Sequence, residues 1–247
     1  DLAWVLKHAE AFDVDVDDQS DVTALLAIQG PKASKIVQGL TETNLDEIGY
    51  YRFALGSVAG VEGVISRTGY TGEDGFELYI PVDGAMKLWD ALMEAGEGEG
   101  LVATGLGCRD SLRLEMGYAL YGNDLDEEHN PLESGLAWIT KMDKGDFIGK
   151  EALVKQKEEG VTRRLVGLKL LDRGFPRHGY PIASEGADVG EVTSGVVSPS
   201  LGFGVAMGYV PIALAKAGSE VGIRIRNKVI PSVVQRPPFY GEGSVRK

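Results

Sequence analysis

A glycine-rich segment, residues 66–78, carries the densest set of groups that could do chemistry. It reads Ser-Arg-Thr-Gly-Tyr-Thr-Gly-Glu-Asp-Gly-Phe-Glu-Leu. Its three glycines allow positive φ angles and a close approach of the backbone to a ligand. The carboxylate of Glu77 could accept the paired N–H donors of an aminopyrimidine edge while the Tyr70 ring stacks on the heterocycle. By itself the pattern fits a decorated β-hairpin with solvated acids better than a binding site.

A second candidate is Arg109, which follows Gly105 and Gly107 where a helix is expected to begin. The N-terminal end of a helix repels a cation. The placement therefore indicates a partner carboxylate, which could be Glu77, Asp110 or a group on a ligand.

Other catalytic arrangements are missing from the sequence. His8, His129 and His178 are far apart and lack metal-ligand spacing. The single cysteine, Cys108, excludes an internal disulfide and is expected to be a small buried hydrophobic residue. No nucleophile elbow, P-loop or dinucleotide fingerprint occurs. We therefore expect a site of carboxylate, arginine and aromatic groups, with no metal.

Composition narrows the classes of partner. The formal charge is −12 over 247 residues, which disfavours binding to nucleic acid phosphates and to anionic membranes. The chain is 43% hydrophobic and 25% charged, as expected of a globular protein, and no apolar run is long enough to span a membrane.

These residues must be positioned by strands and helices. The strands and helices expected up to about residue 160 indicate an α+β fold. Alternation in the expected strand 75–80 places Phe76 and Leu78 on one face and Glu77 on the other. Apolar runs predict further strands at 24–30, 50–55, 63–68, 101–104 and 138–142, with a short edge strand around Val14 and Val16. Helical periodicity predicts helices at 2–9, 31–40, 82–97, 109–120 and 150–159.

The residue pattern of the sequence changes at about residue 161. Short Val/Ile/Leu runs alternate with Gly/Pro/Ser turns at 165–171, 189–194, 203–210, 221–225 and 229–234, a pattern typical of an all-β barrel or sandwich. We expect one region at 1–160 and a C-terminal β-barrel domain at 161–247. The acidic segment 121–135 is either a functional loop or a flexible surface loop.

Six motifs occur in order along the chain. They are Ala27-Ile-Gln-Gly-Pro, Gly69-Tyr-Thr-Gly-Glu-Asp-Gly-Phe-Glu, Gly105-Leu-Gly-Cys-Arg-Asp-Ser-Leu-Arg-Leu-Glu, Leu120-Tyr-Gly-Asn-Asp-Leu-Asp-Glu, Val192-Thr-Ser-Gly-Val-Val-Ser-Pro-Ser-Leu and Ala206-Met-Gly-Tyr-Val-Pro. Together they closely resemble the aminomethyltransferase, or T-protein, family of the glycine cleavage system, shortened at the N-terminus.

The resemblance implies two interleaved α+β subdomains around a tetrahydrofolate site, followed by a β-barrel. It implies transfer of an aminomethyl group from the lipoyl arm of H-protein, release of ammonia, and formation of methylene-tetrahydrofolate. Carried over by motif, Glu77 would bind the pterin edge, Arg109 would contact the folate, and Tyr70 and Tyr50 would line the pocket. Trp138 is a weaker pocket candidate and could equally be a core residue.

Two departures from the family pattern bear on activity. The family's key acid lies in a Gly-Gly-x-x-Asp-Asp-like stretch that would lie upstream of residue 1, so no catalytic residue is assigned, and the chain alone is expected to be poorly active. In the tail, a folate-contacting tyrosine of some relatives would fall near Ser244, and Tyr240 is not clearly its equivalent.

Alternatives with the same fold are a folate-dependent demethylase and the C-terminal folate domain of a dimethylglycine or sarcosine dehydrogenase. An alternative of another class is a non-catalytic folate-binding factor for iron–sulfur assembly, whose Lys-Gly-Cys-x-x-Gly-Gln-Glu motif is missing here. The expected location is the cytoplasm of a bacterium or archaeon, or the mitochondrial matrix in a eukaryote.

Overall fold

The computed structural model describes residues 1–246, which form two compact units. The first unit comprises residues 1–104 together with the C-terminal residues from Gly243, and the second comprises residues 105–242. Each unit is described by itself.

The first unit is built on a four-stranded antiparallel sheet with the strand order β1-β4-β3-β2. Its strands are β1 (Thr23–Gln29), β2 (Phe53–Val58), β3 (Val61–Ser66) and β4 (Gly75–Pro81). Its helices are α1 (Leu2–Ala9), α2 (Ala33–Gln38) and α3 (Ala85–Gly96), with short 3₁₀ turns at Leu45–Glu47, Val82–Gly84, Glu97–Glu99 and Ser244–Arg246.

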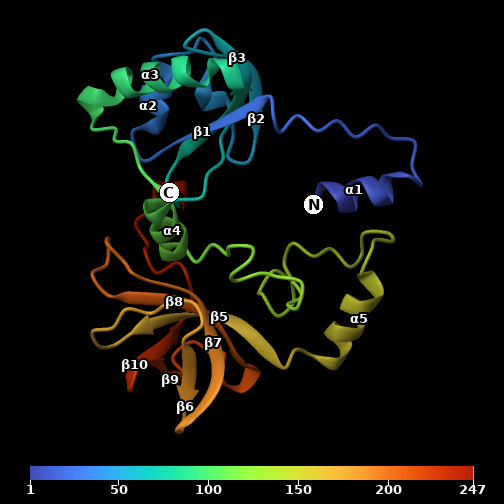
Figure 1. The fold of residues 1–247 in the computed structure, drawn as a ribbon, viewed down its shortest axis with the longest axis vertical. Coiled ribbons are helices and arrows are strands. Elements are labelled where there is room, and N and C mark those ends of the chain that lie inside the picture. The colour runs from blue at the N-terminus through green and yellow to red at the C-terminus, as the bar shows by residue number, and fades with distance from the viewer. Residues whose placement is uncertain (247) are drawn as a thin grey trace. The chain divides into compact units, whose positions relative to one another are not determined.

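One face of this sheet is covered by α2 and α3 (Figure 1). Alternate strand residues such as Ile28, Phe76 and Leu78 point to that side and are buried with Leu88 and Leu92 of α3. Full burial of one such side chain contributes about 1.5–3 kcal/mol relative to exposure. This core therefore packs the sheet against its helices and fixes which strand residues face away from them.

The other face of the sheet carries exposed apolar side chains. Leu55 is 76% exposed, Phe53 is 67% exposed and Leu25 is 45% exposed. Glu77 lies on this face, because its strand neighbours Phe76 and Leu78 are in the core. The alternation predicted for this strand is confirmed.

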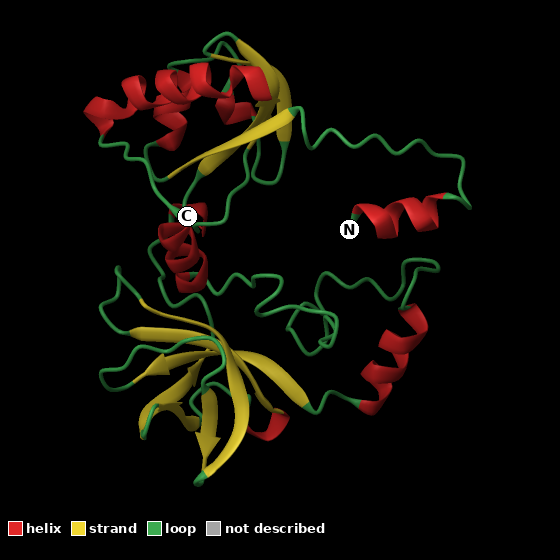
Figure 2. Ribbon diagram, in the orientation of Figure 1, coloured by secondary structure: helices red, strands yellow, loops and turns green. Residues whose placement is uncertain are grey.

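The second unit consists of a closed antiparallel barrel with the strand order β10-β5-β8-β7-β6-β9, together with two helices and a long connecting segment (Figures 1 and 2). The barrel strands are β5 (Arg163–Leu170), β6 (Pro181–Ser184), β7 (Ala187–Val197), β8 (Gly204–Pro211), β9 (Glu220–Ile225) and β10 (Lys228–Gln235). The helices are α4 (Leu106–Glu115) and α5 (Lys150–Glu159), and a 3₁₀ turn spans Ile212–Leu214. The predicted α+β fold followed by a barrel is confirmed.

Several predicted elements differ from the structure. Residues 101–104, 138–142 and the segment around Val14 and Val16 form no strand, because short apolar runs do not by themselves select a partner strand. Strand β6 was not predicted. Helix α4 begins at Leu106 and ends at Glu115, so Arg109 does not begin it. The helix stops early because Gly117 adopts a left-handed conformation with φ of 70°.

Among the described residues, the structure has no helix of the length and apolar character that crossing a bilayer requires.

Candidate functional site

Glu77 is held in place by hydroxyl groups on the open face of the first sheet. The Thr68 hydroxyl donates a hydrogen bond of 2.5 Å to Glu77 Oε2, and Thr68 Oγ1 lies 3.0 Å from Ser66 Oγ. Ser66 pairs with Glu77 across β3 and β4. The carboxylate thus has a defined orientation and faces a surface of apolar side chains, which suits recognition of a flat heterocycle that has N–H donors at one edge.

Ser66 and Thr68 were not among the predicted site residues. The signal that could have found them is their alternation with Arg67 at the end of a predicted strand, since this places both hydroxyls on the face of Glu77.

The two tyrosines predicted to line the pocket lie at the same end of the sheet as Glu77. Tyr70 follows the last residue of β3, Ser66, in the connection to β4. Tyr50 precedes β2, whose first residue, Phe53, pairs with Ser66. The Tyr50 ring lies 4.6 Å from the Tyr51 ring in an edge-on arrangement. The structure therefore brings together the three predicted site residues of this unit at one end of one sheet.

A polar scaffold fixes the turn that carries Tyr70. Gln29 Nε2 donates to the carbonyl oxygen of Thr68 at 3.0 Å, and the Thr71 hydroxyl donates to Gln29 Oε1 at 3.1 Å. A Cβ atom on Gly69 would overlap Gln29 Oε1. Glycine at this position is therefore required for Gln29 to reach the turn.

Asp74 forms an ion pair with Arg67 and does not need a ligand to balance its charge. Arg67 donates to both carboxylate oxygens, at 2.9 and 2.7 Å, and to the carbonyl oxygens of Leu45 and Ile48. The hydrogen bond from Arg67 holds the pKa of Asp74 below its ordinary value, although burial acts in the opposite direction. Among the acids of this segment, Glu77 is thus the one on the sheet's open face.

Arg109 belongs to the second unit, on α4. Its side chain is exposed, in the first half of the helix. The neighbouring acid, Asp110, accepts two hydrogen bonds from Arg113, at 2.6 and 2.8 Å, so the carboxylate beside Arg109 is bound within the helix. Since Glu77 and Arg109 lie in different units, their joint contact with one ligand stays a prediction.

The C-terminal half of α4 is fixed to the barrel by a fully buried ion pair. Arg113 is 1% exposed and Asp124 is 0% exposed, and Arg113 Nη1 lies 2.7 Å from Asp124 Oδ2. Asp124 also accepts hydrogen bonds from the hydroxyl groups of Thr193 and Ser194 on β7. This network positions the helix that presents Arg109.

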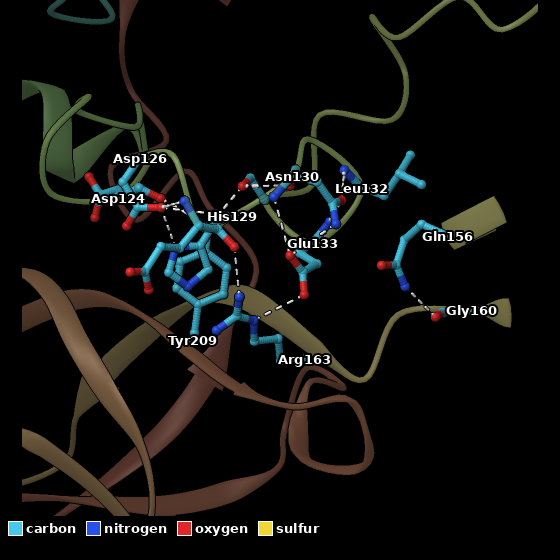
Figure 3. A network of polar contacts seen from close by, with 12 residues as sticks. Asp124, Asp126, His129, Asn130, Leu132, Glu133, Gln156, Gly160, Arg163 and Tyr209 are labelled. Atoms are coloured by element: carbon cyan, nitrogen blue, oxygen red, sulfur yellow. Dashed lines mark hydrogen bonds and ion pairs between the residues drawn. The ribbon is translucent and has the colours of Figure 1, made fainter. Parts of the chain in front are cut away.

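The acidic segment 121–135 is tied to the barrel by side-chain contacts, as Figure 3 shows. His129 stacks on the Tyr209 ring with 3.8 Å between ring centroids, and its Nδ1 lies 2.7 Å from Asp126 Oδ1, which accepts the hydrogen bond. The Ser134 and Tyr209 hydroxyls lie 2.7 Å apart, and Arg163 on β5 pairs with Glu133 at 3.0 Å. The interpretation of this segment as a loosely held surface loop therefore does not fit these contacts.

One further prediction is wrong, and one of two alternatives is excluded. Cys108 is exposed and is not a buried hydrophobic residue, because it lies in the part of α4 that precedes the buried Arg113. Trp138 is 73% exposed, which excludes the core alternative, and its role as a pocket residue stays a prediction. Within residues 1–246, no group of three or more His, Cys, Asp or Glu side chains is placed to hold a metal ion.

Two family models match the chain. The GCVT N-terminal domain matches residues 1–144, and the glycine cleavage T-protein C-terminal barrel domain matches residues 163–241. The chain belongs to the glycine cleavage T-protein family.

Relatives in this family cover nearly the whole chain. It is 52% identical over 239 residues to the aminomethyltransferase of Halothermothrix orenii, covering 97% of this chain and 67% of that protein. It is 49% identical over 242 residues to the aminomethyltransferase of Bacteroides thetaiotaomicron, with the same coverage. The crystal structure of glycine cleavage system aminomethyltransferase T from Bartonella henselae matches with a TM-score of 0.87 at 33% identity, covering 98% of this chain and 66% of that one. The chain thus spans about two thirds of the length of these T-protein relatives.

Proposed function

We propose that the chain is the folate-binding and barrel part of an aminomethyltransferase that acts in glycine cleavage. The proposed donor is the aminomethyl group on the lipoyl sulfur of H-protein, and the proposed acceptor is tetrahydrofolate. The carbon–sulfur bond breaks to leave a thiol, the amino group leaves as ammonia, and the carbon bridges the two folate nitrogens as methylene-tetrahydrofolate.

The orientation of Glu77 is the observation that carries this proposal. A carboxylate that is oriented by Thr68 and faces an apolar surface can accept two parallel N–H donors from the amino-pyrimidine edge of the pterin. The tyrosines at this end of the sheet, Tyr70 and Tyr50, supply ring faces for the heterocycle. Arg109 supplies a cation for the negatively charged glutamate tail of the folate.

The family relationship supports the reaction type over the alternatives with the same fold. The relatives that are 52% and 49% identical are both named aminomethyltransferase. The lipoylated H-protein, the cytoplasmic location and tetrahydrofolate as the co-substrate are parts of the same proposal.

The role of this chain's own residues is to bind and orient the folate. Holding the attacking folate amine in line with the aminomethyl carbon supplies a large share of the rate acceleration in such transfers. The family's acid, which assists that attack, has no equivalent that we assign among the described residues.

Replacement of Glu77 tests the proposed function. In Glu77→Gln the charge-assisted hydrogen bond to the pterin is lost, at a cost of about 1.5–3 kcal/mol. The Kd for tetrahydrofolate, measured by calorimetry, is expected to rise roughly 10- to 150-fold.

The matched control is Glu62→Gln, because Glu62 is an exposed carboxylate at the other end of the same sheet. Its Kd is expected to equal that of the parent chain. An unchanged Kd in Glu77→Gln would remove Glu77 from the folate site, and no binding by the parent chain would overturn the proposed function itself.

A further inference from the structure

The C-terminal tail reaches the glycine-rich turn of the first unit. Ser244 lies 171 residues beyond Glu73 in the sequence, yet their side chains are in contact. The Ser244 hydroxyl donates to Glu73 Oε2 at 2.5 Å, and the Ser244 backbone N–H donates to the same oxygen at 3.1 Å. One residue of the tail therefore holds the Glu73 carboxylate with two donors.

The backbone of the turn is held by the same residue. The Asp74 backbone N–H donates to Ser244 Oγ at 2.8 Å, and the Val245 N–H donates to the carbonyl oxygen of Gly72 at 3.3 Å. Gly243 is buried, and a Cβ atom there would overlap the Gly72 carbonyl. The tail backbone thus lies directly against the turn backbone, with no room for a side chain at Gly243.

The turn is consequently fastened by two independent sets of contacts. Arg67 binds the turn through Asp74, and Gln29 of β1 binds it through Thr71. Ser244 holds it through Glu73 and the Asp74 amide. Glu73 is therefore engaged by the tail, as Asp74 is by Arg67.

We propose that Ser244 is a positioning residue for the folate site, and that the tail acts as a clasp on the Gly72–Asp74 turn. The clasp limits the motion of the connection that carries Tyr70 and Thr68, and Thr68 in turn orients Glu77. A site residue held by such supporting hydrogen bonds binds its ligand with less ordering cost. This inference rests on the proposed function for its effect on folate, but the clasp itself can be tested without folate.

Hydrogen exchange tests the clasp directly. In Ser244→Ala the Asp74 amide loses its acceptor, so exchange of this amide is expected to become about three- to tenfold faster, because a typical hydrogen bond is lost. Ser244→Thr keeps the hydroxyl and is expected to restore slow exchange. Ser57→Ala is the matched control, since Ser57 lies on β2, paired with Glu62 at the other end of the sheet.

Calorimetry with tetrahydrofolate tests the positioning role. The Kd is expected to rise about three- to tenfold in Ser244→Ala and to return to the parent value in Ser244→Thr. Glu73→Gln, which weakens the acceptor of the clasp, is expected to act in the same direction as Ser244→Ala. This second variant keeps the test decisive if Ser244→Ala folds poorly.

The outcomes separate the clasp from the proposed function. Unchanged exchange at Asp74 in both variants would overturn the clasp, whether or not the chain binds folate. Faster exchange with an unchanged Kd would overturn the positioning role and leave a purely structural contact. If the parent chain binds no tetrahydrofolate, the positioning role fails together with the proposed function, while the exchange rates still decide whether the clasp exists.

Discussion

At the scale of single residues, the acids of the glycine-rich segment have different roles although they are close in sequence. Asp74 is paired with Arg67, Glu73 is bound by Ser244, and Glu77 accepts from Thr68 on the open face of the sheet. Sequence alternation could assign Glu77 to the open face. It could not show that Glu73 meets a residue 171 positions away, because no local pattern encodes that contact.

The Arg67–Asp74 pair predicts a specific dependence of stability on pH. Because the folded-state pKa of Asp74 is lowered, by its hydrogen bond to Arg67, the pair contributes stability above the unfolded-state pKa of about 4. That contribution is lost as the pH falls through the folded-state pKa. Asp74→Asn is expected to lower the free energy of unfolding by about 1–2 kcal/mol at pH 7, and this difference from the parent should shrink below about pH 4.

Urea unfolding at pH values from 7 to the acid limit checks this prediction. Asp90→Asn serves as the control, because Asp90 is an exposed acid of α3 in the same unit. If the difference in the free energy of unfolding between the parent and Asp74→Asn stays constant with pH, the ion pair is not the source of the stability.

At the scale of elements, the buried Arg113–Asp124 pair predicts that α4 depends on a loop that follows it. Removal of one partner of a buried ion pair is costly, because the other charge stays buried. Asp110 remains as a partner of Arg113, so Asp124→Asn is expected to destabilise the chain by about 3 kcal/mol, the lower end for such pairs. Urea unfolding measures this loss.

The exposed pair of Asp188 with Arg224 supplies the control for that measurement. These side chains are 51% and 36% exposed, so Asp188→Asn is expected to change the free energy of unfolding by less than about 1 kcal/mol. Equal losses in the two variants would mean that Asp124 does not stabilise the helix through its charge.

The elements differ in how well the sequence predicts them. Strands with clear alternation, such as β4, and the amphipathic helix α3 could be predicted because burial enforces their periods. The runs at 101–104 and 138–142 were overpredicted, since a short apolar run lacks information about a partner strand. The start of α4 was misplaced because glycine weakens helix propensity but does not forbid a helix, and Gly107 lies inside it.

The candidate site, too, could be predicted only in part. Glu77, Tyr70 and Tyr50 were predicted as site residues from residue type, spacing and family resemblance. The structure puts them at one end of one sheet, and their contact with a ligand stays a prediction. Their supports, Thr68 and Gln29, were missed, because a hydroxyl or amide that orients another side chain is recognised only from distances.

At the scale of the whole molecule, the chain passes twice between its compact units, after Thr104 and after Glu242. The second passage returns the chain to the first unit, where Ser244 contacts the glycine-rich turn. Glu77 lies in the first unit and Arg109 in the second, so the contact of both residues with one folate stays a prediction.

We expect this chain to bind tetrahydrofolate but to catalyse the aminomethyl transfer slowly. The residues proposed to hold tetrahydrofolate lie in this chain, whereas we assign no residue among those described to the task of the acid that assists attack on the aminomethyl carbon. General acid–base assistance contributes about 10²- to 10⁴-fold to the rate of a reaction. With aminomethylated H-protein as the donor, ammonia release by the 247-residue chain should be slower by at least the lower of these factors than release by the Halothermothrix orenii aminomethyltransferase. The Kd values of the two proteins for tetrahydrofolate should differ far less than their rates. Equal rates of ammonia release, measured side by side, would show that a residue within this chain performs the task of the family's acid.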